Sequence, residues 1–390
     1  MADDIGVLIV DDSALMRNLF GKMVETTPGL VIADKAMNGI FALRKIPNVE
    51  PDVIVLDLEM PEMNGIEFLK ERKKRGITIP VIILSSLASS GAEITMEALA
   101  LGASDFIQKP SGSISTDIHL VKDNLMHMLL GYGGRYRKTH GKKSSGTPAA
   151  PTLTPPLPAA SSSSLSLHSA ENIRQTLSGL ISPSSGPVVA PTPLRKPGKT
   201  EIIAIGISTG GPDALRQVFA RLDADLKVPF VVVQHMPPGF TNEFAKSLDR
   251  VCPLEVKEAE EGDLIKPGRI LIAQGNKHLE VERKPLASIV HLSDTPPVSG
   301  HRPSADVLFA SVAKAYSNHA LGIIMTGMGR DGAEQLGAIY REGGLTIGQD
   351  EASAVVYGMP RVAHEFGHVM EQVPLDKMAE RICSLAKAVR

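Results

Sequence analysis

The stretch VIVLDLEMPEMNG, residues 53–65, joins a short apolar run to a turn that contains proline and glycine, with Asp57 at the junction. Similar apolar runs occupy Val7–Val10 and Val81–Leu84, as expected for buried parallel strands. Helical spacing of apolar residues alternates with these runs, up to a last helix that carries Ile118, Val121, Leu125 and Met128. The alternation predicts a five-unit doubly wound α/β domain over residues 1–130.

The character of the sequence changes at about residue 131. Residues 131–199 are rich in serine, proline and alanine and carry few large side chains. Because such a segment buries too little apolar surface to offset its ordering entropy, we predict a flexible linker. Within it, Glu171–Ile181 places apolar residues on one helical face. We interpret this stretch as a transient helix, with docking onto either domain as the alternative.

A second α/β alternation occupies residues 200–390. Five runs have strand character: Ile202–Ile207, Phe230–Gln234, Ile270–Ala273, Leu321–Met325 and Leu345–Ile347. Helical patterns follow several of them, such as Asp213–Leu222 and Asp331–Tyr340. We therefore predict a second doubly wound domain with a mainly parallel sheet.

The composition of the 390-residue chain is that of an ordinary α/β protein, with 43% hydrophobic and 22% charged residues. A net charge of -2 provides no basic field for nucleic acid. The N-terminal MADDIGVLIVDD has no basic stretch before an apolar run, and no apolar run approaches the ~20 residues that span a bilayer. Cys252 and Cys383 lack metal spacing and fit a reducing compartment. We expect a cytoplasmic protein that neither binds nucleic acid nor inserts into membranes.

Polar residues follow the strand ends of the first domain, namely Asp11, Asp12, Asp57, Ser85 and Lys109. The carboxyl ends of parallel strands converge on one edge, so three carboxylates would repel one another there. A hard cation such as Mg²⁺ relieves that repulsion, and one carboxylate can then attack a phosphoryl group. A hydroxyl and an ammonium can bind the phosphoryl oxygens. Solvated aspartates at loop starts are the alternative, and they explain one such residue better than five.

The first domain resembles a response-regulator receiver domain over its whole length. The matching residues are Asp11–Asp12, Asp57 with the following MPEMNG, Ser85, and Lys109–Pro110. The resemblance implies that Asp57 is the phosphoacceptor and that Asp11, Asp12 and Asp57 hold Mg²⁺. It further implies that Lys109 binds the phosphoryl group, that Ser85 is the switch hydroxyl and that Phe106 is the switch aromatic residue.

The second domain contains GISTG at Gly206–Gly210, a G-x-S-x-G pattern between a strand and a helix. This context suits a nucleophile elbow that exposes Ser208, although a glycine-rich turn whose serine only caps the helix fits too. His235 follows the strand in FVVVQHMPPGF, where it is either a base or a packed strand-end histidine. Asp331 follows LGIIMT and a glycine-rich loop and could orient the imidazole. The order Ser–His–Asp differs from that of ordinary α/β-hydrolases.

A competing motif overlaps this region. Gly327, Gly329 and Gly332 form a G-x-G-x-x-G dinucleotide fingerprint after a strand, and Asp350 lies about 20 residues further on. Spacing alone therefore permits an NAD-binding domain. That interpretation leaves Ser208 without a role and puts a negative charge beside the pyrophosphate.

The second domain resembles the catalytic domain of chemotaxis protein-glutamate methylesterases. GISTGGP, QHMPPGF, HRPSADVLF and TGMGRDGA match that family's motifs in order, and a receiver ahead of them is its domain arrangement. The resemblance implies Ser208 as nucleophile, His235 as base and Asp331 as orienting acid. It also implies an oxyanion-hole N–H from Met328 and a place near the imidazole for Thr209. HRPSAD either shapes the rim of the site or is a loop anchored by Arg302 before a helix capped by Ser304.

We therefore expect a phosphorylation-regulated hydrolase that removes γ-methyl esters from chemoreceptor glutamates, and deamidates receptor glutamines by the same route. A chemotaxis histidine kinase would be its phosphodonor. Hydrolysis would need no cofactor, whereas phosphorylation would need Mg²⁺. Two alternatives are a receiver-controlled oxidoreductase, which would bind NAD, and a non-catalytic adaptor, which a serine-directed probe would not label.

Overall fold

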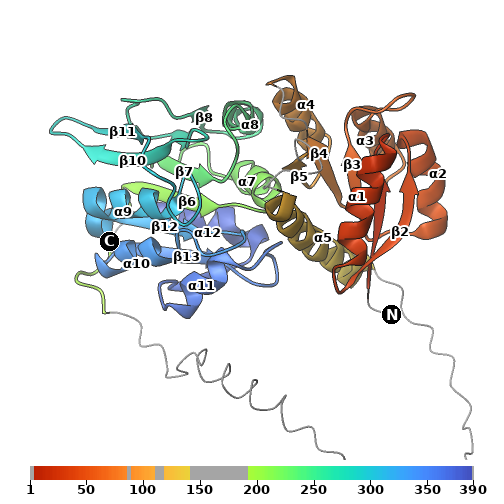
Figure 1. Ribbon diagram of the computed structural model, residues 1–390. Coiled ribbons are helices and arrows are strands. Elements are labelled where there is room, and N and C mark those ends of the chain that lie inside the picture. The colour runs from red at the N-terminus through yellow and green to blue at the C-terminus, as the bar shows by residue number, and fades with distance from the viewer. Residues whose placement is uncertain (1–3, 86–88, 110–117, 141–191, 389–390) are drawn as a thin grey trace, which may run out of the picture. The chain divides into compact units, whose positions relative to one another are not determined.

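The computed structural model describes residues 4–85, 89–109, 118–140 and 192–388. In its N-terminal part, five parallel strands form a sheet in the order β2-β1-β3-β4-β5 (Figure 1). The strands are β1 (Ile5–Val10), β2 (Leu30–Ala36), β3 (Val53–Asp57), β4 (Val81–Ser85) and β5 (Asp105–Gln108). The helices are α1 (Ala14–Glu25), α2 (Gly39–Val49), α3 (Gly65–Lys74), α4 (Ser89–Ala100) and α5 (Ile118–His140). The predicted five-unit doubly wound domain is confirmed.

Both faces of this sheet are covered, which explains why its strands are apolar throughout. The side chains of Val7 and Ile9 pack against apolar side chains of the helices α1 and α5. One of these is Phe20 of α1. Leu8 and Val10 point the other way, into a core with side chains of α2, α3 and α4. The alternation of side chains along a strand thus feeds two separate cores.

The C-terminal part contains a seven-stranded parallel sheet in the order β14-β13-β12-β6-β7-β9-β8. Its strands are β6 (Ile202–Ile207), β7 (Phe230–Gln234), β8 (Glu255–Glu258), β9 (Arg269–Ile272), β12 (Ala320–Ile324), β13 (Leu345–Gln349) and β14 (Glu371–Val373). An antiparallel hairpin, β10 (His278–Arg283) and β11 (Ser288–Ser293), lies beside them. The predicted mainly parallel, doubly wound sheet is confirmed.

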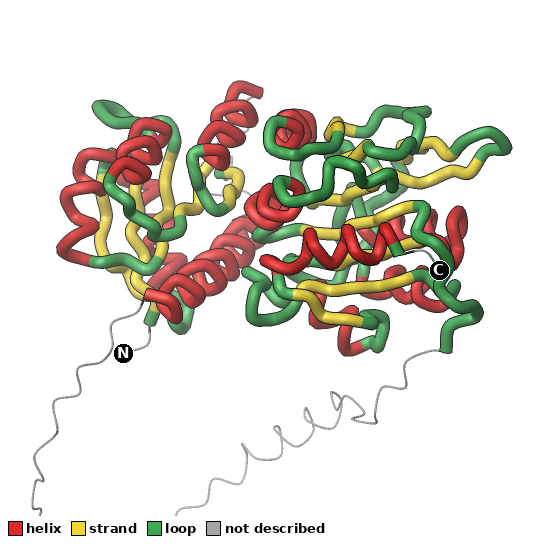
Figure 2. Tube along the Cα trace, turned by 180° about the vertical axis from the view of Figure 1, so that it is seen from behind, coloured by secondary structure: helices red, strands yellow, loops and turns green. Residues whose placement is uncertain are grey.

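Helices cover both faces of this second sheet as well (Figure 2). One group packs with the β6 side chains Ile202 and Ala204, and comprises α9 (Ala305–Tyr316), α10 (Ala333–Arg341) and α11 (Met359–Glu365). The other group packs with Ile203 and Ile205, and comprises α7 (Gly211–Phe219), α8 (Phe240–Asp249) and α12 (Leu375–Lys387). A short 3-10 helix, η1 (Ser317–His319), precedes β12.

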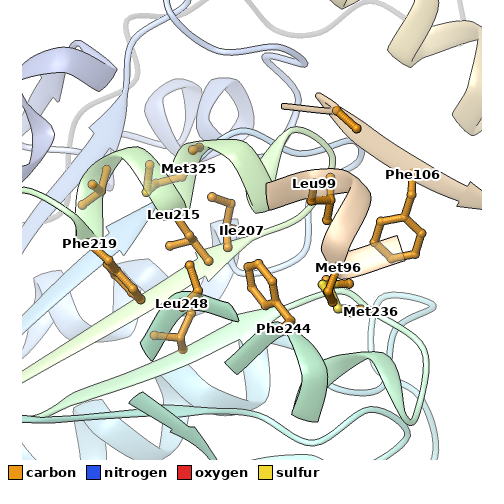
Figure 3. Packing of buried hydrophobic residues seen from close by; sticks show 14 of the residues in the cluster. Met96, Leu99, Phe106, Ile207, Leu215, Phe219, Met236, Phe244, Leu248 and Met325 are labelled. Carbon is orange, nitrogen blue, oxygen red and sulfur yellow. The ribbon is translucent and has the colours of Figure 1, made fainter. Parts of the chain in front are cut away.

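The two domains belong to one compact unit. Helix α4 packs against α8. The ring of Phe106 stacks on Phe240, with centroids 5.1 Å apart and planes 7° apart. Figure 3 shows Met96 and Phe106 of the first domain beside Met236 and Phe244 of the second. The first domain is therefore joined to the second by a buried apolar contact.

The described ends of the predicted linker are ordered parts of the domains. Residues 131–140 continue α5 beyond the boundary predicted at residue 130. Gly133 lets that helix approach β1, because a Cβ there would lie 2.4 Å from the Ile5 side chain, and Tyr132 is buried. At the other end, the Leu194 N–H donates to Arg341 and Arg195 pairs with Glu342. The stretch Glu171–Ile181 lies outside the described residues.

No helix among the described residues combines the length and the apolar character needed to cross a bilayer. Helix α1 is capped by Ser13, whose side chain accepts the hydrogen bond from the Met16 N–H.

Phe309 should be a main contributor to the stability of the second domain, because its ring is fully buried between α9 and the sheet. We expect Phe309→Ala to lower the free energy of unfolding by about 3–5 kcal/mol through lost transfer energy and a residual cavity. Leu286→Ala is the control, since Leu286 is 99% exposed and its loss should cost less than about 0.5 kcal/mol. Urea denaturation followed by circular dichroism measures both, and equal midpoints for the two variants would contradict the assignment.

Candidate active site

Ser208 lies in the sharp turn between β6 and α7. Its N–H donates to the Thr326 carbonyl at 3.0 Å, and its own carbonyl accepts from the Gly211 N–H at 2.8 Å. Gly210 has a φ of 82°, in the left-handed region that glycine adopts at little cost. A Cβ on Gly206 would lie 2.7 Å from the Ala305 Cβ, so the turn also needs its first glycine. The pattern G-x-S-x-G therefore places the serine at the carboxyl edge of the sheet.

His235 follows β7, the strand next to β6, and its two ring nitrogens face different partners. Nδ1 lies 3.0 Å from the Ser208 Oγ, and Nε2 lies 2.7 Å from the Asp331 Oδ2. An ionised carboxylate only accepts, so Nε2 carries the proton that it donates to Asp331. Nδ1 then presents a lone pair to the Ser208 hydroxyl, which is the arrangement of a base beside a nucleophile.

Asp331 is 1% exposed and lies in the loop between β12 and α10. Besides His235, it accepts hydrogen bonds from the Ser304 hydroxyl at 2.6 Å and from the N–H groups of Ala305 and Asp306 at 2.7 and 3.2 Å. Burial alone would raise the pKa of the Asp331 carboxyl, but His235, Ser304 and Ala305 outweigh it and hold the pKa below its ordinary value. The carboxylate is therefore charged at neutral pH and can stabilise a positive imidazolium.

Ser208 and His235 open onto a cavity of about 480 Å³, and Asp331 lies buried behind His235. Thr209 and Met328 line it as well, so four of the five residues predicted for this site share one cavity, and the fifth, Asp331, contacts it only through His235. The cavity is also lined by Asp105 and other β5 residues of the first domain. A carbonyl compound that enters it meets a serine hydroxyl and an imidazole base already in hydrogen-bond contact.

The stretch HRPSAD combines both roles considered for it. His301 and Arg302 line the cavity. The Arg302 guanidinium donates to the Asn276 side chain, and Ser304 caps α9 by accepting from the Asp306 N–H.

Two of the three glycines in the loop 327–332 are crowded by protein atoms, whereas a Cβ on Gly329 would meet nothing within 4 Å. A Cβ on Gly327 would lie 2.3 Å from the Met359 sulfur and 2.9 Å from the Ser208 Cβ. A Cβ on Gly332 would lie 2.8 Å from the Ala305 Cβ. Gly327 and Gly332 therefore allow protein side chains to approach the backbone. Asp350 accepts hydrogen bonds from its neighbour Ser353, as the cap of a local turn.

The acidic residues of the first domain come together at its sheet edge. Asp11, Asp12 and Asp57 each place a carboxylate oxygen within 4.8 Å of the others. The Lys109 ammonium lies 2.6 Å from Asp57 and 3.4 Å from Asp11. Burial raises the pKa values of Asp11 and Asp57 despite this lysine, and the Asp11 Oδ2 is buried without a hydrogen bond. An all-oxygen set with surplus negative charge fits a hard divalent cation.

The two predicted switch residues lie in different surroundings. The Ser85 hydroxyl, at the end of β4, lies 2.7 Å from the Thr95 hydroxyl of α4. Phe106 points into the contact with the second domain, where it stacks on Phe240. Ser86, which adjoins Ser85 in the sequence, lies outside the described residues.

Sequence reasoning missed three residues around Ser208. Gln234 donates to the carbonyls of Ser208 and His235, at 3.0 and 3.1 Å. His301 stacks on His235, and Asp105 of the first domain accepts a 2.7 Å hydrogen bond from the Gly210 N–H. Gln234 and His301 belong to quoted motifs, but Asp105 carries no signal without knowledge of the domain contact.

The chain matches two family descriptions, CheB methylesterase over residues 203–382 and Response regulator receiver domain over residues 7–117. A protein-glutamate methylesterase/protein-glutamine glutaminase of Treponema denticola is 61% identical over 386 residues, covering 97% of this chain and 98% of the relative. Its counterpart from Treponema pallidum is 53% identical over 402 residues, covering 97% of this chain and 96% of the relative. The crystal structure of the Thermotoga maritima CheB methylesterase catalytic domain is 36% identical and covers 48% of this chain and 98% of that chain, with a TM-score of 0.47.

A fluorophosphonate should label Ser208, because the hydroxyl already donates to a base and the oxygen is exposed to the cavity. We expect one labelled peptide by mass mapping, none in Ser208→Ala, and labelling slowed at least tenfold in His235→Ala, which lacks the base. Ser293→Ala is the control outside the site and should label like the unaltered protein. A label on another residue, or none, would contradict the nucleophile assignment.

Proposed function

Because this chain belongs to the protein-glutamate methylesterase/protein-glutamine glutaminase family, we propose that Ser208, His235 and Asp331 are the triad with which it hydrolyses receptor γ-methyl esters. The protein is a carboxylic ester hydrolase joined to a receiver domain. The observation that carries the triad assignment is the continuous hydrogen-bonded chain from the Ser208 hydroxyl through the imidazole to Asp331. Ser208 and His235 line one cavity, and Asp331 is buried behind the imidazole.

In the first half-reaction, the Ser208 oxygen attacks the ester carbonyl while its proton moves to the Nδ1 of His235. The Nε2–H of His235 stays hydrogen-bonded to Asp331, and the negative carboxylate stabilises the imidazolium that results. We assign the Met328 N–H as a donor to the carbonyl oxygen as it becomes negative. The tetrahedral intermediate collapses when methoxide takes the proton from Nδ1, so methanol leaves and an acyl-serine remains.

In the second half-reaction, His235 takes a proton from water, and the hydroxide attacks the acyl-serine. Return of the proton to the Ser208 oxygen releases a glutamate. A glutamine side chain can follow the same sequence with ammonia as leaving group. The substrates we propose are the methylated helices of chemoreceptors, which the protein would meet in the cytoplasm.

The receiver would be charged by a chemotaxis histidine kinase, with Asp57 as the attacking carboxylate. Its oxygen would form a bond to phosphorus as the bond to the donor breaks, giving an acyl phosphate. Asp11, Asp12 and Asp57 would hold Mg²⁺, which neutralises the charge on the phosphoryl oxygens when bound. Lys109 lies close enough to Asp57 to bind one of those oxygens, and Ser85 would supply a hydroxyl to another.

We further propose that the receiver restrains the hydrolase until Asp57 is phosphorylated. Asp105 supports this, because it binds the Gly210 N–H only two residues from the nucleophile, and β5 forms one wall of the cavity. Phe106, the next residue, stacks on Phe240 at the same contact. A shift of this aromatic switch would therefore act directly on the mouth of the active site.

The triad residues should behave as one unit in methanol release from methylated receptor. We expect Ser208→Ala to lower the rate by at least about 10³-fold, since oxyanion and binding effects support only a small background. Because a base without its nucleophile does nothing, Ser208→Ala with His235→Ala should be little worse than Ser208→Ala. Losses that multiply in the double variant would mean that the two residues are not a nucleophile and its base.

The restraint should weaken as the pH rises. Burial raises the pKa of the Asp105 carboxyl from 3.8 to about 7. Its docked state therefore favours the protonated form, so Asp105 supports docking fully below its ordinary pKa and loses this support as the pH rises through about 7. Asp213, Tyr132 and Arg135 face the same region, and burial also raises the pKa of Asp213. We expect the ratio of phosphorylated to unphosphorylated activity to be larger at pH 6 than at pH 8.

The ratio is measured on the full chain at each pH, so the pH dependence of the chemistry cancels. Asp105→Asn keeps an acceptor for Gly210 but does not titrate, and it should flatten the pH dependence of the ratio. Asp213→Asn, which does not touch Gly210, should keep the direction seen in the unaltered protein. A ratio that rises from pH 6 to pH 8 would contradict the role of Asp105.

A further inference from the structure

His301 ends a tight turn that is tied to helix α9. Val298 and His301 exchange backbone hydrogen bonds of 3.1 and 2.9 Å, and the φ values of Ser299 and Gly300 between them are 52° and 80°. Positive φ at both central residues is the geometry of a type I′ turn. The Ser299 hydroxyl donates to Asp306 of α9 at 3.0 Å. The turn therefore has a defined place relative to the helix that begins beside the triad.

Arg302 anchors the other side of this turn. Its guanidinium donates to the Asn276 Oδ1 through two nitrogens, at 3.1 and 2.7 Å. It also donates to the carbonyls of Asp294 and Thr295, at 2.9 and 3.1 Å. A planar guanidinium with several fixed acceptors has one orientation. His301 is thus presented by a backbone that is held on both sides.

The ring of His301 lies flat against that of His235, with centroids 3.8 Å apart and planes 10° apart. Ser208 and Asp331 bind the edges of the His235 ring, so His301 covers one of its faces. Hydrogen bonds at Nδ1 and Nε2 still allow the ring a small tilt about its Cβ–Cγ bond. A flat neighbour at contact distance blocks this tilt, which would otherwise turn the Nδ1 lone pair away from the serine.

We propose that His301 is a positioning residue for hydrolysis, whose flat ring fixes the plane of His235 and so keeps Nδ1 aligned with the Ser208 hydroxyl. This inference rests on the proposed function of the triad and adds a residue to it. His301 acts through His235 and takes no part in bond making. This positioning role requires a planar side chain of similar size, and it needs neither ring nitrogen of His301.

The charge of His301 matters as much as its shape. Burial lowers the pKa of the His301 imidazole to about 4, and the neighbouring His235 lowers it further than Asp331 raises it. The ring is therefore neutral at neutral pH. When His235 takes the serine proton it becomes a cation, and a neutral aromatic face next to it is attractive. A cation in this position would instead repel the imidazolium at the moment it forms.

The test compares His301→Phe, His301→Ala and His301→Lys in the full-length, phosphorylated protein. The readouts are kcat and KM for methanol release, the rate of fluorophosphonate labelling, and thermal unfolding. We expect His301→Ala to lower kcat and the labelling rate by about tenfold, with KM within about twofold, because a misaligned base slows chemistry without weakening binding. His301→Phe should stay within about threefold of the unaltered protein, and His301→Lys should fall below His301→Ala. His291→Ala, on the exposed hairpin, should change neither rate.

Several results would overturn the proposal. A kcat for His301→Phe as low as that for His301→Ala would mean that a ring nitrogen is needed. A raised KM with unchanged kcat would make His301 a substrate contact, and an unchanged kcat in His301→Ala would remove its role. If His301→Ala fails to fold, the other two variants still test the proposal. Equal rates for His301→Phe and His301→Lys would mean that neither a flat ring nor a neutral side chain is required. Ser208→Ala in the same assay tests the triad itself, so failure of the proposed function is seen separately.

Discussion

The buried carboxylate of Asp331 is the feature on which the carboxyl edge of the second sheet depends. A carboxylate without partners would be very costly at a site that is 1% exposed. Four donors surround it: the His235 ring, the Ser304 hydroxyl, and two N–H groups at the start of α9. Charge-assisted hydrogen bonds of this kind contribute about 1.5–3 kcal/mol each, so the set is needed to keep the group ionised. Loss of any one partner would leave charge uncompensated.

This requirement explains several local choices in the sequence. Ser304 both caps α9 and donates to Asp331, and Ala305 is small enough to let Gly206 and Gly332 approach. The N-terminus of α9 points its free N–H groups at the carboxylate, where the helix dipole favours negative charge. The packing that fixes Asp331 therefore also fixes the turn that carries Ser208.

Much of this arrangement could be predicted because parallel sheets bring their carboxyl ends together. Ser208, His235 and Asp331 each follow a strand, and β12, β6 and β7 are neighbours in the sheet. The alternation of apolar runs with helical patterns likewise predicted both doubly wound domains. The acidic cluster at Asp11, Asp12 and Asp57 also follows from strand ends.

What could not be predicted depends on tertiary contacts that leave no periodic signal. The assignment of Nδ1 to the serine and Nε2 to the acid depends on how the His235 ring is turned. The extension of α5 through Gly133 depends on its packing against Ile5, which overrides the low helix propensity of glycine. Asp105 acquires its partner only because β5 meets α7.

The protonation state of the His235 ring tests the account most directly. Nitrogen NMR of ¹⁵N-histidine-labelled protein at neutral pH, assigned by loss of signals in His235→Gln, reports which nitrogen carries the proton. We predict that Nε2 carries the proton and that Nδ1, which faces the serine, is unprotonated. The proton on Nε2 should have a low-field resonance that Asp331→Asn abolishes. A proton on Nδ1, or a low-field resonance that survives Asp331→Asn, would contradict the central role given to the buried carboxylate.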